Sequence, residues 1–196
     1  MKKQNETEDN VGKKEAEERA EIEEHKAKKR AVLEWGVYFV LLAALYIVFH
    51  FFLMLGRIPS ESMEPTLMVH DWTIGDRRAY NDVQPQRGDI IIFYSEEESE
   101  SMVKRVIGLP GETVTFVGGH VYIDGEPLDE SAYLDDSVET GCDEIFVVPE
   151  DSYFMLGDNR EVSLDSRYWE DPYVTPEDIQ SKVLQVIPFH KLPWFQ

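Results

Sequence analysis

Three short stretches of the sequence hold side chains whose types and spacing suit catalysis. Residues 58–67 read IPSESMEPTL, in which two serines lie between prolines that restrict the backbone. Residues 103–112 read VKRVIGLPGE, where Lys104 stands in an apolar, strand-like run. Residues 157–167 read GDNREVSLDSR, a dense run of small, polar and oppositely charged residues. A serine hydroxyl becomes an effective nucleophile when a positioned base removes its proton, and an uncharged lysine amine can be that base.

Each stretch also has an ordinary structural explanation. A Pro-Ser-x-Ser sequence is typical of a turn, a strand lysine often pairs with a carboxylate or extends to solvent, and a Gly-Asp-Asn-Arg loop is often a turn with a salt bridge. The catalytic alternative requires the pKa of Lys104 to fall from its ordinary value of about 10.4. The neighbours Val103, Val106 and Ile107 predict an apolar environment, and burial lowers the pKa of a lysine. A carboxylate in contact with the amine would raise it, so this hypothesis requires a site without close anionic partners.

The composition argues against several other kinds of site. The chain has 196 residues and a single cysteine, Cys142, which excludes an intramolecular disulfide and a metal site built from several thiolates. The five histidines are scattered, with no pair at the H-x-x-x-H spacing of a zinc-binding helix. We therefore expect no metal ion and no cofactor. The net charge of −20, from 19 basic and 39 acidic residues, argues against nucleic acid as a partner.

A membrane anchor is predicted upstream of these stretches. Residues 35–55 read WGVYFVLLAALYIVFHFFLML and contain no charged side chain. As a helix this run would be about 31 Å long, which matches a bilayer core of about 30 Å. A cleavable signal peptide would have a shorter apolar region and a small-residue cleavage site, whereas GRIPSES follows here. The run predicts one uncleaved transmembrane helix, so membrane lipid is an expected partner.

The charges on either side of this run predict its orientation. The twenty residues before it hold five Lys or Arg residues, and the twenty after it hold only Arg57. Basic residues favour the cytoplasmic side of a membrane helix. We therefore expect residues 1–34 to form a charged cytoplasmic segment and residues 56–196 to form an extracytoplasmic domain, with the protein single-pass in the cell membrane.

The outer domain has the pattern of a β protein. Short segments rich in β-branched and aromatic residues alternate with Gly, Pro, Asn and Asp turn signals, at residues 89–94, 103–107, 113–117, 121–123 and 144–148. TVTFVGGHVYIDGEPL predicts a hairpin that turns at Gly118-Gly119. No long amphipathic helix pattern alternates with the strands, so we predict a mainly antiparallel β domain. Residues 95–101 and 126–143 predict exposed acidic loops, and residues 177–180 predict one helical turn capped by Thr175.

Taken together, these stretches resemble the bacterial type I signal peptidases closely. IPSESMEPTL, RGDIIIF, VKRVIGLPGE and GDNREVSLDSR occur in the order and sequence of that family's motifs. The resemblance covers the membrane anchor and nearly all of residues 56–196. It implies a membrane-anchored serine endopeptidase with a serine–lysine dyad and an acyl-enzyme intermediate. The expected substrates are exported preproteins, from which such an enzyme removes N-terminal signal peptides after small residues at the cleavage site.

The same resemblance assigns roles to the reactive side chains. It implies that Ser62 is the nucleophile and that Lys104 is the general base. It also implies that Ser60 contributes to oxyanion stabilisation and that Ser163 orients the lysine. A lysine in the place of the base is typical of the bacterial members rather than of those from the endoplasmic reticulum.

Other positions in these motifs are expected to shape the site. Met63 and Leu67, beside the nucleophile, are expected to line small S1 and S3 pockets. The resemblance implies a structural ion-pair group formed by Arg105, Asp158, Arg160, Asp165 and Arg167. About 45 residues separate the Pro-Gly turn of the lysine motif from the 157–167 stretch. The outer subdomain of larger members is therefore expected to shrink here to a small insertion around residues 113–150.

Two alternative functions remain open at this stage. A self-cleaving, repressor-like protein would share the serine–lysine chemistry, but it would carry a DNA-binding helical region and no membrane span. A non-enzymatic, membrane-tethered binding module would use the acidic outer domain as a docking surface. Labelling of Ser62 by an acylating inhibitor would distinguish this module from a peptidase.

Overall fold

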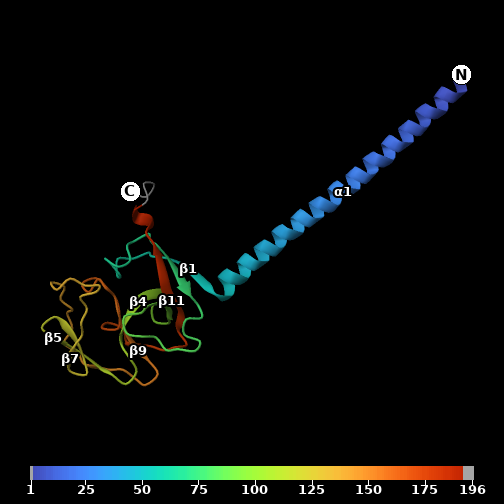
Figure 1. Cartoon of the computed structure of the whole chain (residues 1–196). Helices are drawn as coiled ribbons and strands as arrows, with labels where there is room; N and C mark the ends of the chain where they lie inside the picture. Colours follow the sequence, from blue (N-terminus) through green and yellow to red (C-terminus); the bar gives the residue numbers. More distant parts are fainter. Residues whose placement is uncertain (1, 192–196) are drawn as a thin grey trace. The chain divides into compact units, whose positions relative to one another are not determined.

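A long N-terminal helix precedes the β-rich part of the chain. The computed structural model describes residues 2–191, and α1 spans Lys2–Phe51 (Figure 1). Its Glu23–Phe51 portion is long and apolar enough to cross a membrane, with a mean hydropathy of 2.1 and no burial against protein. The predicted helix boundary at residue 55 is wrong, because α1 ends at Phe51 and the next residues form a strand. Those residues pair with a second strand of the domain, and this pairing replaces the helix.

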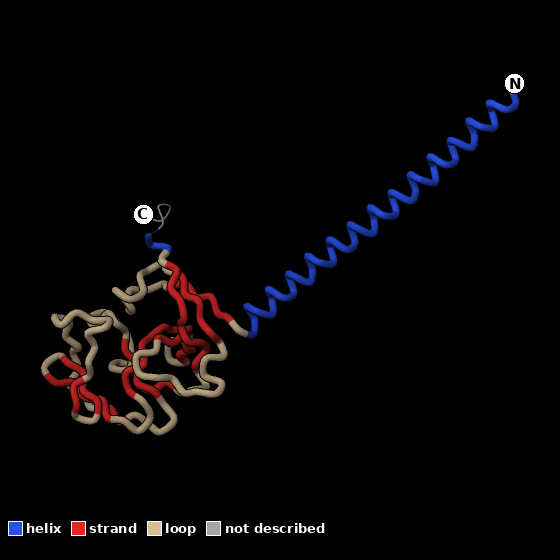
Figure 2. The backbone as a smooth tube through the Cα atoms, in the orientation of Figure 1, coloured by secondary structure: helices blue, strands red, loops and turns tan. Residues whose placement is uncertain are grey.

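The chain from Phe49 onward forms a separate compact unit built on two antiparallel sheets. The larger sheet has seven strands, in the spatial order β1 (Leu53–Arg57), β2 (Trp72–Asp76), β11 (Ile179–Ile187), β3 (Ile90–Ser95), β4 (Glu100–Gly108), β9 (Tyr153–Leu156) and β10 (Tyr173–Val174). The smaller sheet has four, in the order β7 (Glu126–Pro127), β6 (His120–Ile123), β5 (Thr113–Val117) and β8 (Phe146–Val147). Strands and loops alternate throughout this unit (Figure 2), and a short 3₁₀ helix at Phe189–Lys191 follows β11. The prediction of a mainly antiparallel β domain with one N-terminal helix is confirmed.

The predicted hairpin is present at the start of the smaller sheet. Val117 pairs directly with His120, which leaves Gly118 and Gly119 as a two-residue turn between β5 and β6. Both glycines have positive φ angles, 61° and 82°, as a type I′ turn requires. Glycine adopts these angles without steric cost, which explains the Gly-Gly pair in the sequence.

Three apolar clusters hold the domain together. One cluster packs Ile91, Phe93 and Trp169 against the larger sheet. A second joins the two sheets, with Phe146 and Phe154 stacked at a ring-centroid distance of 4.6 Å. The third consists of Ile58, Met63 and Leu67, packed against partly buried Ile90, Val103 and Val186. This third cluster anchors the loop between β1 and β2, which carries the two serines of the first motif.

Two local predictions on the C-terminal side need correction. Residues 177–180 do not form a helical turn: residues 176–178 make a hydrogen-bonded turn, and β11 begins at Ile179. Thr175 Oγ1 and the Thr175 amide both donate to Asp178 Oδ2, so the threonine closes a turn rather than capping a helix. Ile179 then pairs with Phe93 of β3, and this strand pairing overrides the local helix signal.

Candidate active site

The loop between β1 and β2 holds Ser62 in a fixed position. The two ends of the loop are joined by backbone hydrogen bonds between Ile58 and Asp71 and between His70 and Ile58, each 2.9 Å long. Met63, directly after Ser62, is 1% exposed in the apolar cluster below. With its neighbour locked into the core, Ser62 is half-buried at the surface of the domain.

Lys104 reaches this serine from the centre of the larger sheet. It lies in β4 opposite Ile91 of β3, and it is 2% exposed. Its Nζ lies 2.9 Å from Ser62 Oγ, although 42 residues separate the two in sequence. Ser60 Oγ lies 3.3 Å from the same oxygen. The structure thus brings together three of the four side chains that the resemblance assigned to the chemistry.

Burial controls the charge of the Lys104 amine. Desolvation lowers the pKa of Lys104 from 10.5 to about 8, and the nearby Arg167 guanidinium acts in the same direction. Three carboxylates, those of Asp165, Glu100 and Asp158, oppose this shift through their negative charge. Among the described residues, no carboxylate forms an ion pair with the Lys104 amine. The amine contacts the uncharged hydroxyl of Ser62 instead, so desolvation outweighs the carboxylates and the pKa of Lys104 falls.

The hydrogen bond to Lys104 that the resemblance implies for Ser163 is not formed in the structure. Its side chain is 2% exposed, and its Oγ forms no hydrogen bond within the part of the chain described here, including to Lys104. The hydroxyl packs against Gly157, where an added Cβ would lie 2.1 Å from Ser163 Oγ and 2.4 Å from the Ser62 carbonyl oxygen. Position 157 therefore has to be glycine, because the β1–β2 loop that carries Ser62 and the 157–167 loop meet at its Cα.

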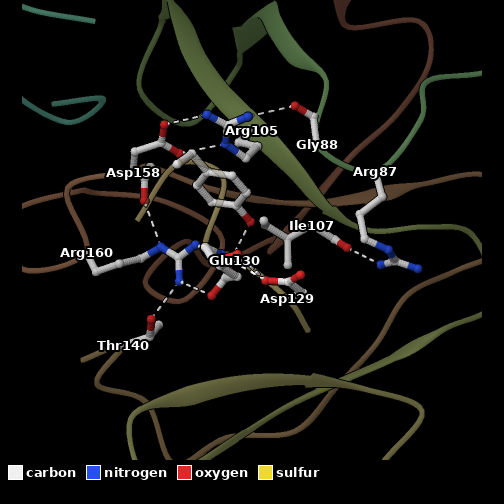
Figure 3. Close-up of polar contacts among 12 residues, drawn as sticks. Arg87, Gly88, Arg105, Ile107, Asp129, Glu130, Thr140, Asp158 and Arg160 are labelled. Atoms are coloured by element: carbon white, nitrogen blue, oxygen red, sulfur yellow. Dashed lines mark hydrogen bonds and ion pairs between the residues drawn. The ribbon is translucent and has the colours of Figure 1, made fainter. Parts of the chain in front are cut away.

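Three buried arginines organise the 157–167 loop, and Figure 3 shows two of them, Arg105 and Arg160. Arg105 donates to both carboxylate oxygens of Asp158, at 2.8 and 2.6 Å, and to the Gly88 carbonyl at 2.8 Å. Arg167 pairs with Asp165 at 2.8 Å, and both side chains are fully buried. The structure brings the predicted ion-pair residues into one group, with a correction: the carboxylate partner of Arg160 is Glu130, at 2.6 Å, and it comes from outside the 157–167 loop.

Two grooves meet at the Ser62–Lys104 pair. One has a volume of about 240 Å³ and includes Met54, Gly56, Ile58 and Met63 among its lining residues. The other has a volume of about 480 Å³, and acidic and apolar side chains line it together with the same pair. Met63 is among the lining residues of the smaller groove. Leu67 lines neither groove, because it is fully buried in the apolar cluster beneath the loop.

Sequence reasoning missed several residues that shape this site. Glu100 and Met102 line both grooves together with the predicted Lys104, and strand alternation in 100–108 contains that signal because every second residue shares a face. Thr66, whose hydroxyl donates to Asp158, and Glu130 carried no signal, since both meet their partners only through the tertiary fold. Within residues 2–191, no group of three or more His, Cys, Asp or Glu side chains is arranged to hold a metal ion.

Comparison with known proteins places this geometry in a family. The family model described as "Signal peptidase, peptidase S26" matches residues 32–187. Signal peptidase I of Leptolyngbya laminosa is 42% identical over 69% of this chain and 69% of its own length. Probable signal peptidase I-2 of Synechocystis sp. is 39% identical over 70% of this chain and 65% of its length, and signal peptidase I P of Bacillus subtilis subsp. natto is 36% identical over 78% and 87%. The chain therefore belongs to the signal peptidase family, peptidase S26, and is a serine peptidase of the bacterial type I class.

Proposed function

We propose that this protein is a membrane-anchored endopeptidase that removes N-terminal signal peptides from exported preproteins through a Ser62–Lys104 dyad. The observation that carries the proposal is the 2.9 Å approach of a buried lysine amine to a serine hydroxyl at the junction of two grooves. Burial makes the amine a usable base near neutral pH, since its pKa of about 8 leaves about one molecule in ten uncharged at pH 7. The names of the relatives support preproteins as the substrates.

The proposed reaction is acyl transfer to Ser62. The neutral Lys104 amine accepts the Ser62 proton as Oγ attacks the scissile carbonyl carbon and forms a tetrahedral intermediate. When this intermediate collapses, the lysine ammonium donates the proton to the departing amine of the mature protein. A water molecule, deprotonated by the same amine, then attacks the acyl carbon of the acyl-enzyme. The bond between that carbon and Ser62 Oγ breaks, the lysine ammonium returns the proton to Oγ, and the signal peptide leaves with a free carboxylate.

Negative charge develops on the scissile carbonyl oxygen in the transition state, and hydrogen-bond donors are needed to stabilise it. We assign this role to the Ser62 backbone N–H and the Ser60 hydroxyl, whose oxygen lies 3.3 Å from Ser62 Oγ. Loss of one such donor costs about 3–4 kcal/mol in other proteases. Ser163 has a buried hydroxyl without a hydrogen-bond partner in the described chain, which leaves that hydroxyl available for the role of orienting the Lys104 amine.

The acyl chain is expected to bind in the smaller groove. Its volume of about 240 Å³ and its Met and Ile lining suit short apolar side chains on the acyl side of the scissile bond. Larger side chains would have to displace Met63, which is 1% exposed and fixed in the core. A preference for small residues at the cleavage site follows from that packing.

The helix supports a membrane anchor that holds enzyme and substrate on one surface. The span lies within Glu23–Phe51, the charged segment before it faces the cytoplasm, and the β unit lies outside the membrane. Confinement of both partners to one bilayer raises their effective concentration. Cysteine accessibility labelling, with single cysteines introduced before and after the helix in a Cys142→Ser background, tests this orientation.

The decisive experiment incubates the purified protein with a labelled preprotein and sequences the new N-terminus. Wild type is expected to cut after the signal peptide, whereas Ser62→Ala and Lys104→Met are expected to show no cleavage. Retained cleavage by Lys104→Met would refute the dyad. Failure of wild type to cut, together with failure of an acylating inhibitor to label Ser62, would favour a non-enzymatic binding module.

A further inference from the structure

The acidic segment at residues 129–141 contacts the site in a way that the family assignment does not explain. It has no regular secondary structure, and most of its side chains are exposed. Three of the less exposed side chains are polar: Glu130 is 13% exposed, Tyr133 is half-buried and Thr140 is 2% exposed. These three point into the domain, and each contacts an arginine of the ion-pair group.

The contacts form one connected group (Figure 3). The Arg160 guanidinium donates to Glu130 Oε1 at 2.6 Å, to Glu130 Oε2 at 3.1 Å and to Thr140 Oγ1 at 2.6 Å. The Tyr133 hydroxyl donates to Glu130 at 2.7 Å, and burial together with that carboxylate raises the pKa of Tyr133, which keeps the donor proton in place. The Tyr133 ring also lies under the Arg105 guanidinium, 3.9 Å from its Cζ.

Charge balance shows what this segment contributes to the 157–167 loop. Arg105 has the Asp158 carboxylate and Arg167 has Asp165, both from the loop itself. In the described chain, the only carboxylate that forms an ion pair with the fully buried Arg160 side chain is that of Glu130. Without Glu130 the loop would contain a buried, uncompensated cation, which is strongly unfavourable.

The same arginines connect the segment to the nucleophile. Arg160 Nε donates to the Gly157 carbonyl at 3.0 Å, and Gly157 packs against the Ser62 carbonyl. The backbone N–H of Asn159 donates to that same Ser62 carbonyl oxygen at 3.1 Å. A shift of Arg160 would therefore move the backbone on which Ser62 rests, and a displacement of about 1 Å in such a position can lower the rate about a hundredfold.

We propose that Glu130 and Tyr133 are positioning residues for catalysis, which fix the 157–167 loop against Ser62 through Arg160 and Arg105. The inference rests on the proposed peptidase function and adds a role for a segment outside the family's motifs. It predicts that the acidic segment acts on turnover rather than on substrate affinity, because none of these side chains lines either groove at Ser62.

The test uses the full-length protein in detergent with a short signal-peptide substrate. Glu130→Ala and Tyr133→Leu are expected to lower kcat on the order of 10–100-fold while KM stays the same. Tyr133→Phe retains the ring beneath Arg105 and is expected to keep most of the wild-type kcat. Glu130→Gln retains the size and one acceptor oxygen, and it is expected to fall between wild type and Glu130→Ala.

Two control variants separate positioning from general effects. Asp136→Asn removes one charge from an exposed site in the same segment, and it is expected to leave kcat unchanged. Val121→Ala weakens the core of the smaller sheet without a contact to the arginines, so it lowers Tm while kcat stays at the wild-type value. Equal loss of kcat in Val121→Ala and Glu130→Ala at matched Tm would overturn the inference, as would wild-type kcat in Glu130→Ala and Tyr133→Leu.

Wild type and Ser62→Ala in the same assay keep the two levels of inference apart. Cleavage that does not depend on Ser62 would refute the proposed function, and the positioning role would fail with it. Cleavage that depends on Ser62 but is unaffected by Glu130→Ala and Tyr133→Leu would refute the positioning role alone.

Discussion

Lys104 is the residue on which the proposed chemistry depends, and its burial lowers the free energy of unfolding of the domain. A buried ammonium loses its hydration, and the lowered pKa of about 8 expresses that cost. Ser62 and Ser60 offer hydroxyls nearby but no negative charge. In the proposed mechanism this desolvation destabilises the charged form of the Lys104 amine, which is the condition for its use as a base near neutral pH.

This arrangement predicts that Lys104→Met stabilises the domain at neutral pH. The folded-state pKa lies below the unfolded value of 10.5, so the unfolded chain binds more protons between pH 8 and 10.5 and wild-type stability rises with pH across that window. At pH 7 the full cost is present, on the order of 3 kcal/mol. Denaturant unfolding in detergent should show Lys104→Met more stable than wild type at pH 7, with the difference vanishing above pH 10.5. A less stable variant at pH 7 would contradict the desolvated site.

A second prediction concerns the carboxylate of Glu100. Its charge raises the pKa of Lys104, so Glu100→Gln is expected to lower that pKa further. The rise of kcat/KM with pH, which has its midpoint at the Lys104 pKa, should then move to lower pH. Glu96→Gln is the matched control, because Glu96 lies in the acidic turn just before β4 but outside both grooves. A pH profile that does not move, or that moves equally in the control, would exclude this role for Glu100.

The sequence motifs pointed to Ser62 and Lys104, which the structure brings together, but they did not predict most of the contacts around them. Ser62 and Lys104 carried a signal because each lies in a distinctive local motif. The pairing of Arg160 with Glu130 carried none, because 30 residues separate the two and Glu130 lies in an irregular acidic stretch. The free hydroxyl of Ser163 was also unpredictable, since its environment is set by the backbone of Gly157.

Among the elements, the strands with strong local signals were predicted and those that depend on their neighbours were not. The β5–β6 hairpin has alternating β-formers and a two-glycine turn, so its position followed from residues 113–123. β2 reads WTIGD and β11 reads IQSKVLQVI, which contain polar residues and resemble loop or helix segments. Both become strands because each pairs with a neighbouring strand on two sides. Those partners are distant in sequence, so the local pattern of residues does not reveal them.

The hairpin turn gives a prediction about the smaller sheet. Gly118→Val is expected to destabilise the protein by about 1–2 kcal/mol, because its φ of 61° is strained for a β-branched residue. Gly118→Asn is expected to cost less, since asparagine tolerates this region and a Cβ at this position meets open space. Thermal unfolding of the two variants measures the difference. The kcat of both should match wild type, and equal Tm values would contradict the turn assignment.

For the whole molecule, the junction between α1 and β1 decides where the chain can be truncated without loss of the groove. α1 ends at Phe51 and β1 begins at Leu53, where five residue pairs join it to β2. β1 also contributes Met54 and Gly56 to the smaller groove. The predicted anchor boundary at residue 55 would have assigned three of the five residues of this strand to the membrane.

Truncation at two positions tests this boundary. A chain of residues 52–196 is expected to cleave a short soluble peptide as well as the full protein does in detergent, because the groove is intact. Its rate on preproteins in vesicles should fall on the order of a hundredfold, since the shared surface is lost. A chain of residues 58–196 lacks β1 and should lose peptide cleavage too. Equal activity of both truncated chains would show that β1 is dispensable.

The order of the strands has a consequence for handling the protein at high concentration. Within residues 2–191, three of the four sheet edges are strands of two residues: β10, β7 and β8. Edges this short offer few free backbone groups on which another copy could continue a sheet. The fourth edge, β1, is five residues long and follows directly from the helix. We therefore expect concentrated samples to form fibrils more readily once β1 is released from β2, for example after a protease cuts next to β1.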